Sequence, residues 1–135
     1  SPFIANFIGE SNLLSGVLTV SDEGARLVLD GGAAIDVSPR ADLGLVSARP
    51  ARVMVRPERF VDLSVGTPNA RLNRISGEVR ECAYTGGSDR YRVVSSDGLE
   101  LLVRLPSGPG RRRYQPGDCI EVGFAATDTR IVEVR

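Results

Sequence analysis

The sequence contains no histidine, no lysine and no tryptophan. Without histidine there is no imidazole that titrates near neutral pH and no histidine ligand for a metal ion. Without lysine there is no amine for a Schiff base and no lysine of a phosphate-binding P-loop. The 17 basic residues are therefore all arginine, and 17 acidic residues balance them to a formal net charge of zero. These absences disfavour an enzyme active site and a resident cofactor or metal ion.

Long apolar runs and targeting signals are also lacking. No run approaches the roughly 18 apolar residues that a membrane-spanning helix needs. The N-terminus has no basic region followed by an apolar one, which a secretory signal would have. The chain starts at Ser1-Pro2 without an initiator methionine. We expect a fragment from inside a longer chain, and a processed N-terminus is the alternative.

Cysteine is scarce, with only Cys82 and Cys119 and no C-x-x-C pair. A structural zinc site needs closely spaced cysteine or histidine ligands, so this chain is not expected to hold one. The sequence leaves a disulfide between the two residues open. We favour two buried free thiols, as in a reducing cytoplasm.

The sequence is rich in short alternating runs bounded by glycine, proline and aspartate. Val53 and Val55 are separated by Met54, and apolar residues alternate over positions 99–105 and 120–124. Side chains on a strand point to opposite faces in turn, so each run predicts a half-buried strand. Short strands separated by such turns predict an all-β barrel or sandwich.

The chain divides into three segments by composition. Residues 1–10 carry an apolar stripe that predicts one short helix, ended by Gly9. Residues 11–63 form a first β-segment, and residues 74–135 form a second after a loop rich in turn residues. Residues 14–18 also resemble residues 75–79, which suggests two β-units built on one plan.

Three blocks of residues occur in an order that resembles a known domain family. Residues 7–14, with sequence FIGESNLL, come first, and residues 53–58, with sequence VMVRPE, follow. The third block comprises Gly77-Glu78-Val79, Tyr84-Thr85-Gly86 and Arg90-Tyr91. Together they resemble the transport-associated OB (TOBE) domain of bacterial ABC-transporter ATP-binding subunits. The first block is most similar to the polyamine (spermidine/putrescine) and iron(III) importer branch.

The resemblance implies a fold and a role. The fold would consist of OB-like β-barrel units, here with one short N-terminal helix. The role would be that of a C-terminal regulatory and accessory domain that helps to assemble the ATPase dimer. Its partners would be its own ATPase domain, a second copy of the subunit and, indirectly, the membrane permease subunits. ATP and Mg²⁺ would bind to the missing domain, and the subunit would lie peripherally on the cytoplasmic face of the inner membrane.

Two groups of residues are candidate interface features. Phe3, Phe7 and Ile8 form an apolar stripe that needs a surface to cover it. Arg56 and Glu58 flank a proline, which fixes the direction in which the chain leaves the strand. An Arg-Pro-Glu corner would then aim two opposite charges at a neighbouring lobe or subunit, with a local surface ion pair as the alternative.

Other polar motifs favour less specific interpretations. Thr85, Gly86 and Ser88 could form a small anion-binding nest, but an ordinary hairpin turn is favoured. The run Arg111–Tyr114 is interpreted as a solvated loop rather than a nucleic-acid patch, and Tyr91 as a core residue. Glu78 and Glu81 lie three apart, which on a regular strand places them on opposite faces.

Two other functions remain as alternatives to the accessory domain. One is a free-standing OB module for a small ligand or oxyanion, and the other is an OB-type nucleic-acid binder. The zero net charge and the few aromatic residues disfavour nucleic acid as a partner.

Overall fold

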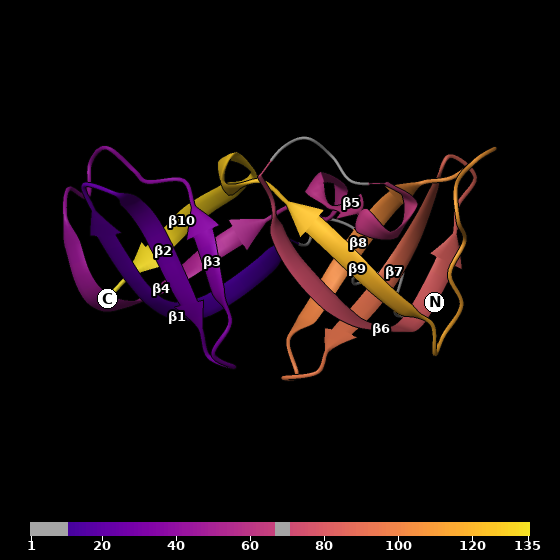
Figure 1. Ribbon diagram of the computed structural model, residues 1–135, viewed down its shortest axis with the longest axis horizontal. Coiled ribbons are helices and arrows are strands. Elements are labelled where there is room, and N and C mark those ends of the chain that lie inside the picture. The colour runs from indigo at the N-terminus through magenta and orange to yellow at the C-terminus, as the bar shows by residue number, and fades with distance from the viewer. Residues whose placement is uncertain (1–10, 67–70) are drawn as a thin grey trace. The chain divides into compact units, whose positions relative to one another are not determined.

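Strands account for most of the regular structure in the computed structural model, which describes residues 11–66 and 71–135 (Figure 1). Three short 3-10 turns complete it: η1 (Pro57–Arg59), η2 (Leu63–Val65) and η3 (Ala126–Asp128). The strands within these described ranges are β1 (Asn12–Ser21), β2 (Gly24–Leu29), β3 (Ala34–Val37), β4 (Val46–Val55), β5 (Val61–Asp62), β6 (Asn73–Tyr84), β7 (Ser88–Ser95), β8 (Glu100–Pro106), β9 (Cys119–Phe124) and β10 (Thr129–Val134).

The strands form two five-stranded sheets that repeat one order. The first sheet runs β10-β4-β1-β2-β3 and the second runs β5-β9-β6-β7-β8. When β1–β4 are matched with β6–β9, the two orders coincide, and β5 takes the place that β10 has in the other sheet. The two β-units of one plan that the sequence repeat predicts are therefore confirmed.

Each sheet belongs to its own compact unit. One unit contains Leu13–Val55 and Ala125–Arg135, and the other contains Arg56–Phe124 with the described residues Ser11 and Asn12. In the chain, β5 follows β4 but joins the sheet of β6–β9. Likewise, β10 follows β9 but joins the sheet of β1–β4. The segments predicted from the sequence run in chain order, whereas the units exchange residues 56–63 and 125–135.

Alternation of apolar and polar residues builds the core of each unit. On β1 every second residue is buried, and Leu14 and Leu18 are fully covered. Val53 and Val55 are buried on β4 while Arg52 is exposed, as the sequence predicts. Burial of such aliphatic side chains contributes about 1.5–3 kcal/mol each. The predicted all-β fold is confirmed.

The core of the unit around β6–β9 adds aromatic residues to the aliphatic ones. Phe60 packs edge-on against Phe124 with ring centroids 5.4 Å apart. Tyr91 packs edge-on against Tyr114 at 5.7 Å, and both rings are fully buried. The interpretation of Tyr91 as a core residue is therefore confirmed.

A β-bulge corrects the prediction for Glu78 and Glu81. Glu78 pairs with Val94 and Glu81 pairs with Arg92, and the register shifts between Val79 and Glu81. Val94 and Arg92 are two apart on β7 and share a face, so their partners Glu78 and Glu81 also share one face. The prediction of opposite faces is wrong because it assumes a regular strand.

The cysteines are free, but the expected burial is wrong for one of them. Cys82 is half-buried on β6, and Cys119 is exposed at the start of β9. Sequence patterns did not indicate that β9 begins at an accessible position.

Candidate functional site

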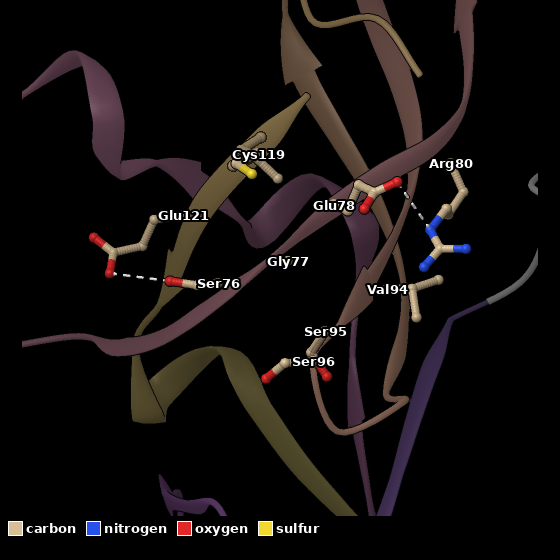
Figure 2. Close-up of a pocket in the computed structure, with 10 residues that line it drawn as sticks. Ser76, Gly77, Glu78, Arg80, Val94, Ser95, Ser96, Cys119 and Glu121 are labelled. Atoms are coloured by element: carbon tan, nitrogen blue, oxygen red, sulfur yellow. Dashed lines mark hydrogen bonds and ion pairs between the residues drawn. The ribbon is translucent and has the colours of Figure 1, made fainter. Parts of the chain in front are cut away.

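A groove lies over β6, at the glycine of the repeated motif. Its volume is about 530 Å³, and it lies where β9, β6 and β7 run side by side. Gly77 lies at its centre, between Ser76 and Glu121 on one side and Glu78 and Arg80 on the other (Figure 2). The residues that line it are Ser76, Gly77, Glu78, Arg80, Val94, Ser95, Ser96, Cys119, Ile120 and Glu121.

A side chain has no room at Gly77. A Cβ at this position would lie 2.8 Å from both the Val93 side chain and the Val94 carbonyl oxygen. The strands therefore approach closely beneath the groove, and the sheet curves around the glycine.

Ion pairs hold the two carboxylates of the groove. Glu121 accepts a hydrogen bond from Arg74 at 3.2 Å and a longer one from Ser76 at 3.5 Å. Glu78 pairs with Arg80 at 3.4 Å. All of these charged side chains are largely exposed, so each pair contributes only ~0–1 kcal/mol. Hydroxyl, carboxylate and guanidinium groups together suit a polar or cationic partner better than an oxyanion.

An equivalent but smaller groove lies at the other copy of the motif. Its volume is about 180 Å³, and Ser15 and Gly16 take the places of Ser76 and Gly77. Its wall is formed by residues 50–52 of β4, which correspond to residues 119–121 of β9. The correspondence follows because β4 and β9 occupy equivalent places in the two sheets. Val55 ends β4 and Phe124 ends β9, each just before the chain enters a 3-10 turn.

The last residues of β10 narrow this second groove. Arg52 donates to Glu133 at 2.8 Å, and Arg135 donates to the same carboxylate at 2.7 Å. Hydrogen bonds from Arg135 and then Arg52 lower the pKa of Glu133. In the sheet of β6–β9, β5 stops after two residues, so the groove at Gly77 stays wide.

A partly buried polar cluster surrounds Tyr114, in the segment that joins β8 to β9. The Tyr114 hydroxyl donates to Asp62 at 2.7 Å and also contacts the Ser64 hydroxyl. The Tyr114 N–H donates to the Tyr91 hydroxyl at 3.0 Å, and the Tyr84 hydroxyl donates to the Tyr114 carbonyl at 2.5 Å. Burial raises the pKa of Tyr114 and raises that of Tyr91 to about 12. The hydrogen bonds of Tyr114 thus hold the β8–β9 connection against the start of η2.

The arginine run before Tyr114 is only partly the solvated loop that the sequence predicts. Its three arginines are exposed, whereas Tyr114 is fully buried. The Arg112 guanidinium lies 4.4 Å from the centre of the Tyr114 ring, and that of Arg113 lies 4.1 Å from the Tyr84 ring. Arg113 also pairs with buried Asp89 at 3.4 Å. The prediction is therefore wrong for Tyr114. The alternation of residues along strands does not indicate that a residue in a loop is buried.

The predicted Arg-Pro-Glu corner lies where the chain passes from one unit to the other. Arg56 and Glu58 are exposed, and Pro57 between them is buried at the start of η1. The Arg59 N–H donates to the Arg56 carbonyl at 3.0 Å and closes the turn. The corner is thus a fixed turn with two exposed charges, and its proposed interface role stays a prediction.

The other predicted site residues fall into two groups. Phe3, Phe7 and Ile8 lie outside the described residues. Thr85, Gly86 and Ser88 form the tight turn between β6 and β7, in which the Thr85 N–H and hydroxyl both donate to the Ser88 carbonyl at 3.0 Å. The Gly86 carbonyl accepts from the Ser107 hydroxyl at 2.5 Å. Anion binding at this turn stays a prediction.

Among the described residues there is neither a metal-binding cluster nor a membrane-spanning helix. In residues 11–66 and 71–135 no three His, Cys, Asp or Glu side chains gather closely enough to hold a metal ion. Within the same ranges no helix is long and apolar enough to cross a membrane.

Residues 53–132 match the family model of the TOBE domain. Several curated proteins match a larger part of the chain. The spermidine/putrescine import ATP-binding protein PotA of Thermobifida fusca is 36% identical over 105 residues, which is 75% of this chain and 26% of that protein. The PotA protein of Rubrobacter xylanophilus is 31% identical over 129 residues, covering 92% of this chain and 32% of that protein. The chain thus spans about a quarter to a third of the length of these relatives.

A solved structure shares the fold of the chain. It is that of the cytoplasmic molybdate-binding protein ModG in a form with molybdate bound, with a TM-score of 0.75. The match covers 92% of this chain and 96% of ModG, at 17% sequence identity. At this identity the likeness concerns the fold alone.

Proposed function

Because this chain belongs to the TOBE domain family, we propose that it is the C-terminal accessory domain of the ATP-binding subunit of a bacterial ABC importer. The observation that carries the proposal is the match to PotA proteins, which extends over 92% of the chain in one case. The chain aligns with only about a third of that relative, as expected for one domain of a larger subunit.

We further propose that the importer carries a polyamine such as spermidine or putrescine, because the matching relatives bear that name. The partners of the domain would be its own ATPase domain, a second copy of the subunit and, indirectly, the membrane permease subunits. The subunit would lie on the cytoplasmic face of the inner membrane. ATP and Mg²⁺ would bind outside this chain, which lacks both a lysine and the G-x-x-x-x-G-K-[ST] loop.

The most direct test of this proposal is to determine the coding sequence immediately upstream of Ser1. It should encode a nucleotide-binding domain with a phosphate-binding loop, and neighbouring genes should encode a permease and a solute-binding protein. Titration of the present chain with Mg-ATP should give no saturable heat. A micromolar ATP site in this chain, or an upstream region without a phosphate loop, would contradict the assignment.

Within this function we propose that the Arg56–Glu58 corner contacts a neighbouring lobe or subunit. Both charges are exposed on a turn that Pro57 fixes. In the full-length subunit, Arg56→Ala should weaken dimerisation or transport-coupled ATP hydrolysis, while the melting temperature of the present chain stays nearly unchanged. A large loss of melting temperature with normal assembly would instead assign the corner a structural role.

The fold likeness to a molybdate-binding protein does not lead us to propose oxyanion binding. The groove at Gly77 contains two carboxylates and one guanidinium, and carboxylates repel an oxyanion. Calorimetric titration with sodium molybdate should accordingly show no tight binding, and a submicromolar site would reverse this preference.

A further inference from the structure

The fourth strands of the two sheets occupy equivalent places, but their outer edges are covered to different extents. In one sheet β10 continues along β4, with Glu133 opposite Arg52 and Val134 opposite Ala51. The N–H of Arg135 then donates to the Pro50 carbonyl at 2.8 Å. The outer edge of β4 is therefore paired as far as Pro50.

The outer edge of β9 is paired over a shorter length. β5 places Val61 opposite Gly123 and Asp62 opposite Val122, and the chain then turns into η2. Within residues 11–66 and 71–135, no strand pairs with residues 119–121 on the side away from β6. These residues correspond to the positions on β4 that the end of β10 covers.

The uncovered part of β9 is accessible to solvent. Cys119 is exposed, and 40% of the Glu121 side chain is exposed. The groups that bind the Glu121 carboxylate, Arg74 and Ser76, both lie on β6, on the inner side of β9. A strand edge without a neighbour presents N–H and C=O groups that can pair with an added strand.

We propose that the edge of β9 at residues 119–121 binds an extended segment of a partner polypeptide by strand addition. The segment would run antiparallel to β9, as β10 runs along β4. It would carry an arginine or lysine opposite Glu121. The strand-binding edge is independent of the importer assignment, since it rests on the two sheets alone.

The charge of the partner follows from the comparison between the sheets. On β4 the covered position carries Arg52, and the strand that covers it supplies Glu133 at 2.8 Å. On β9 the corresponding position carries Glu121, so the complementary residue is basic. Charge complementarity of this kind sets register and specificity more than affinity.

Disulfide trapping tests the register of the added strand. The probe is a synthetic peptide with the sequence of residues 129–135, in which Glu133→Arg supplies the basic residue and Arg135→Cys a thiol. The protein is the full chain carrying Cys82→Ala, so that Cys119 is its one thiol. Position 135 of the peptide should lie opposite Cys119, as Arg135 lies opposite Pro50. In a glutathione buffer this peptide should cross-link at least roughly tenfold faster than a peptide with Val134→Cys, whose thiol points away.

Charge reversal tests the chemistry of the partner. Glu121→Arg should weaken binding of the Glu133→Arg peptide by about two- to fivefold and improve binding of the peptide with native Glu133 by a similar factor. Glu78→Arg is the matched control because it makes the same charge change on β6, away from the edge. It should leave the preference between the two peptides unchanged.

Three results would overturn the proposal. One is cross-linking without preference between positions 134 and 135. Another is an equal loss of peptide binding in Glu121→Arg and Glu78→Arg, which would point to a diffuse acidic surface or a free polycation. The third is formation of Cys119–Cys119 dimers by the chain alone in preference to peptide capture, which would make a second copy the occupant.

Discussion

Two glycines at equivalent positions determine how tightly each sheet can curve. A Cβ on Gly16 would lie 2.1 Å from the Val28 carbonyl oxygen, and one on Gly77 would lie 2.8 Å from the Val94 carbonyl oxygen. Both contacts are with backbone, which cannot move aside as the end of a flexible side chain can. Each glycine follows a serine in the repeated motif. The Ser-Gly pair therefore marks the position where two strands approach closely.

Replacement of one of these glycines should therefore destabilise the fold. We expect Gly16→Ala to lower the free energy of unfolding by about 1–3 kcal/mol, because the strands must separate to admit the methyl group. Equilibrium denaturation in urea measures the change. Gly87→Ala is the control, since a Cβ there would meet nothing within 4 Å, and its effect should be small. Equal effects of the two substitutions would mean that the close approach does not limit stability.

The connection between β8 and β9 shows how one side chain orders an element that has no regular structure. Tyr114 is fully buried and its hydroxyl donates a hydrogen bond to Asp62, the second residue of the two-residue strand β5. A strand of two residues forms few hydrogen bonds with its neighbour, so pairing alone stabilises it little. The Asp62 carboxylate also accepts from the Ser64 N–H at 2.9 Å, which starts η2. Tyr114 therefore helps to hold β5 in the sheet.

Loss of the Tyr114 hydroxyl should weaken this attachment. Tyr114→Phe removes a hydrogen bond to a carboxylate and should lower the free energy of unfolding by about 1–3 kcal/mol. Hydrogen exchange should show the extra loss of protection at Val61 and Asp62. Tyr84→Phe provides a comparison, because it also removes a tyrosine hydroxyl bonded within the cluster but comes from a residue that is 42% exposed. An unchanged stability for Tyr114→Phe would show that solvent satisfies Asp62 equally well.

At the scale of the whole molecule, the exchange of fifth strands links residues that are far apart in the chain. β10 comes from the C-terminal end and pairs with β4, with Thr129 opposite Val55 and Ile131 opposite Val53. Ile131 is buried in the core of that unit. The stability of the N-terminal strands thus depends on the last residues of the chain.

Removal of residues 129–135 should consequently act on one sheet in particular. We expect amide protection to fall in β4 and β1, which lose a neighbouring strand and the side chain of Ile131, while β7 and β8 keep theirs. Hydrogen exchange read by mass spectrometry on the truncated chain checks this pattern. The full chain with Arg130→Ala, an exposed position on β10, should retain protection in both sheets. Loss confined to β7 and β8 would contradict the observed strand order.

Local patterns in the sequence were sufficient to predict the strands and the family. Alternation at Val53 and Val55, and over residues 99–105 and 120–124, predicts strands that the structure contains, because side-chain direction on a strand is a local property with a period of two. The motif blocks likewise indicated the TOBE family that residues 53–132 match. The corner at Arg56–Glu58 was visible because proline restricts the backbone wherever it occurs.

The choice of neighbouring strands, and of the groups that they leave accessible, could be read from the folded structure alone. The exchange of β5 and β10, the bulge that turns Glu78 and Glu81 to one face, the burial of Tyr114 and the uncovered edge at Cys119 and Glu121 all depend on pairing between distant segments. Periodicity within a strand carries no record of the partner strand or of where its ladder ends. Those features are non-local properties of the folded chain.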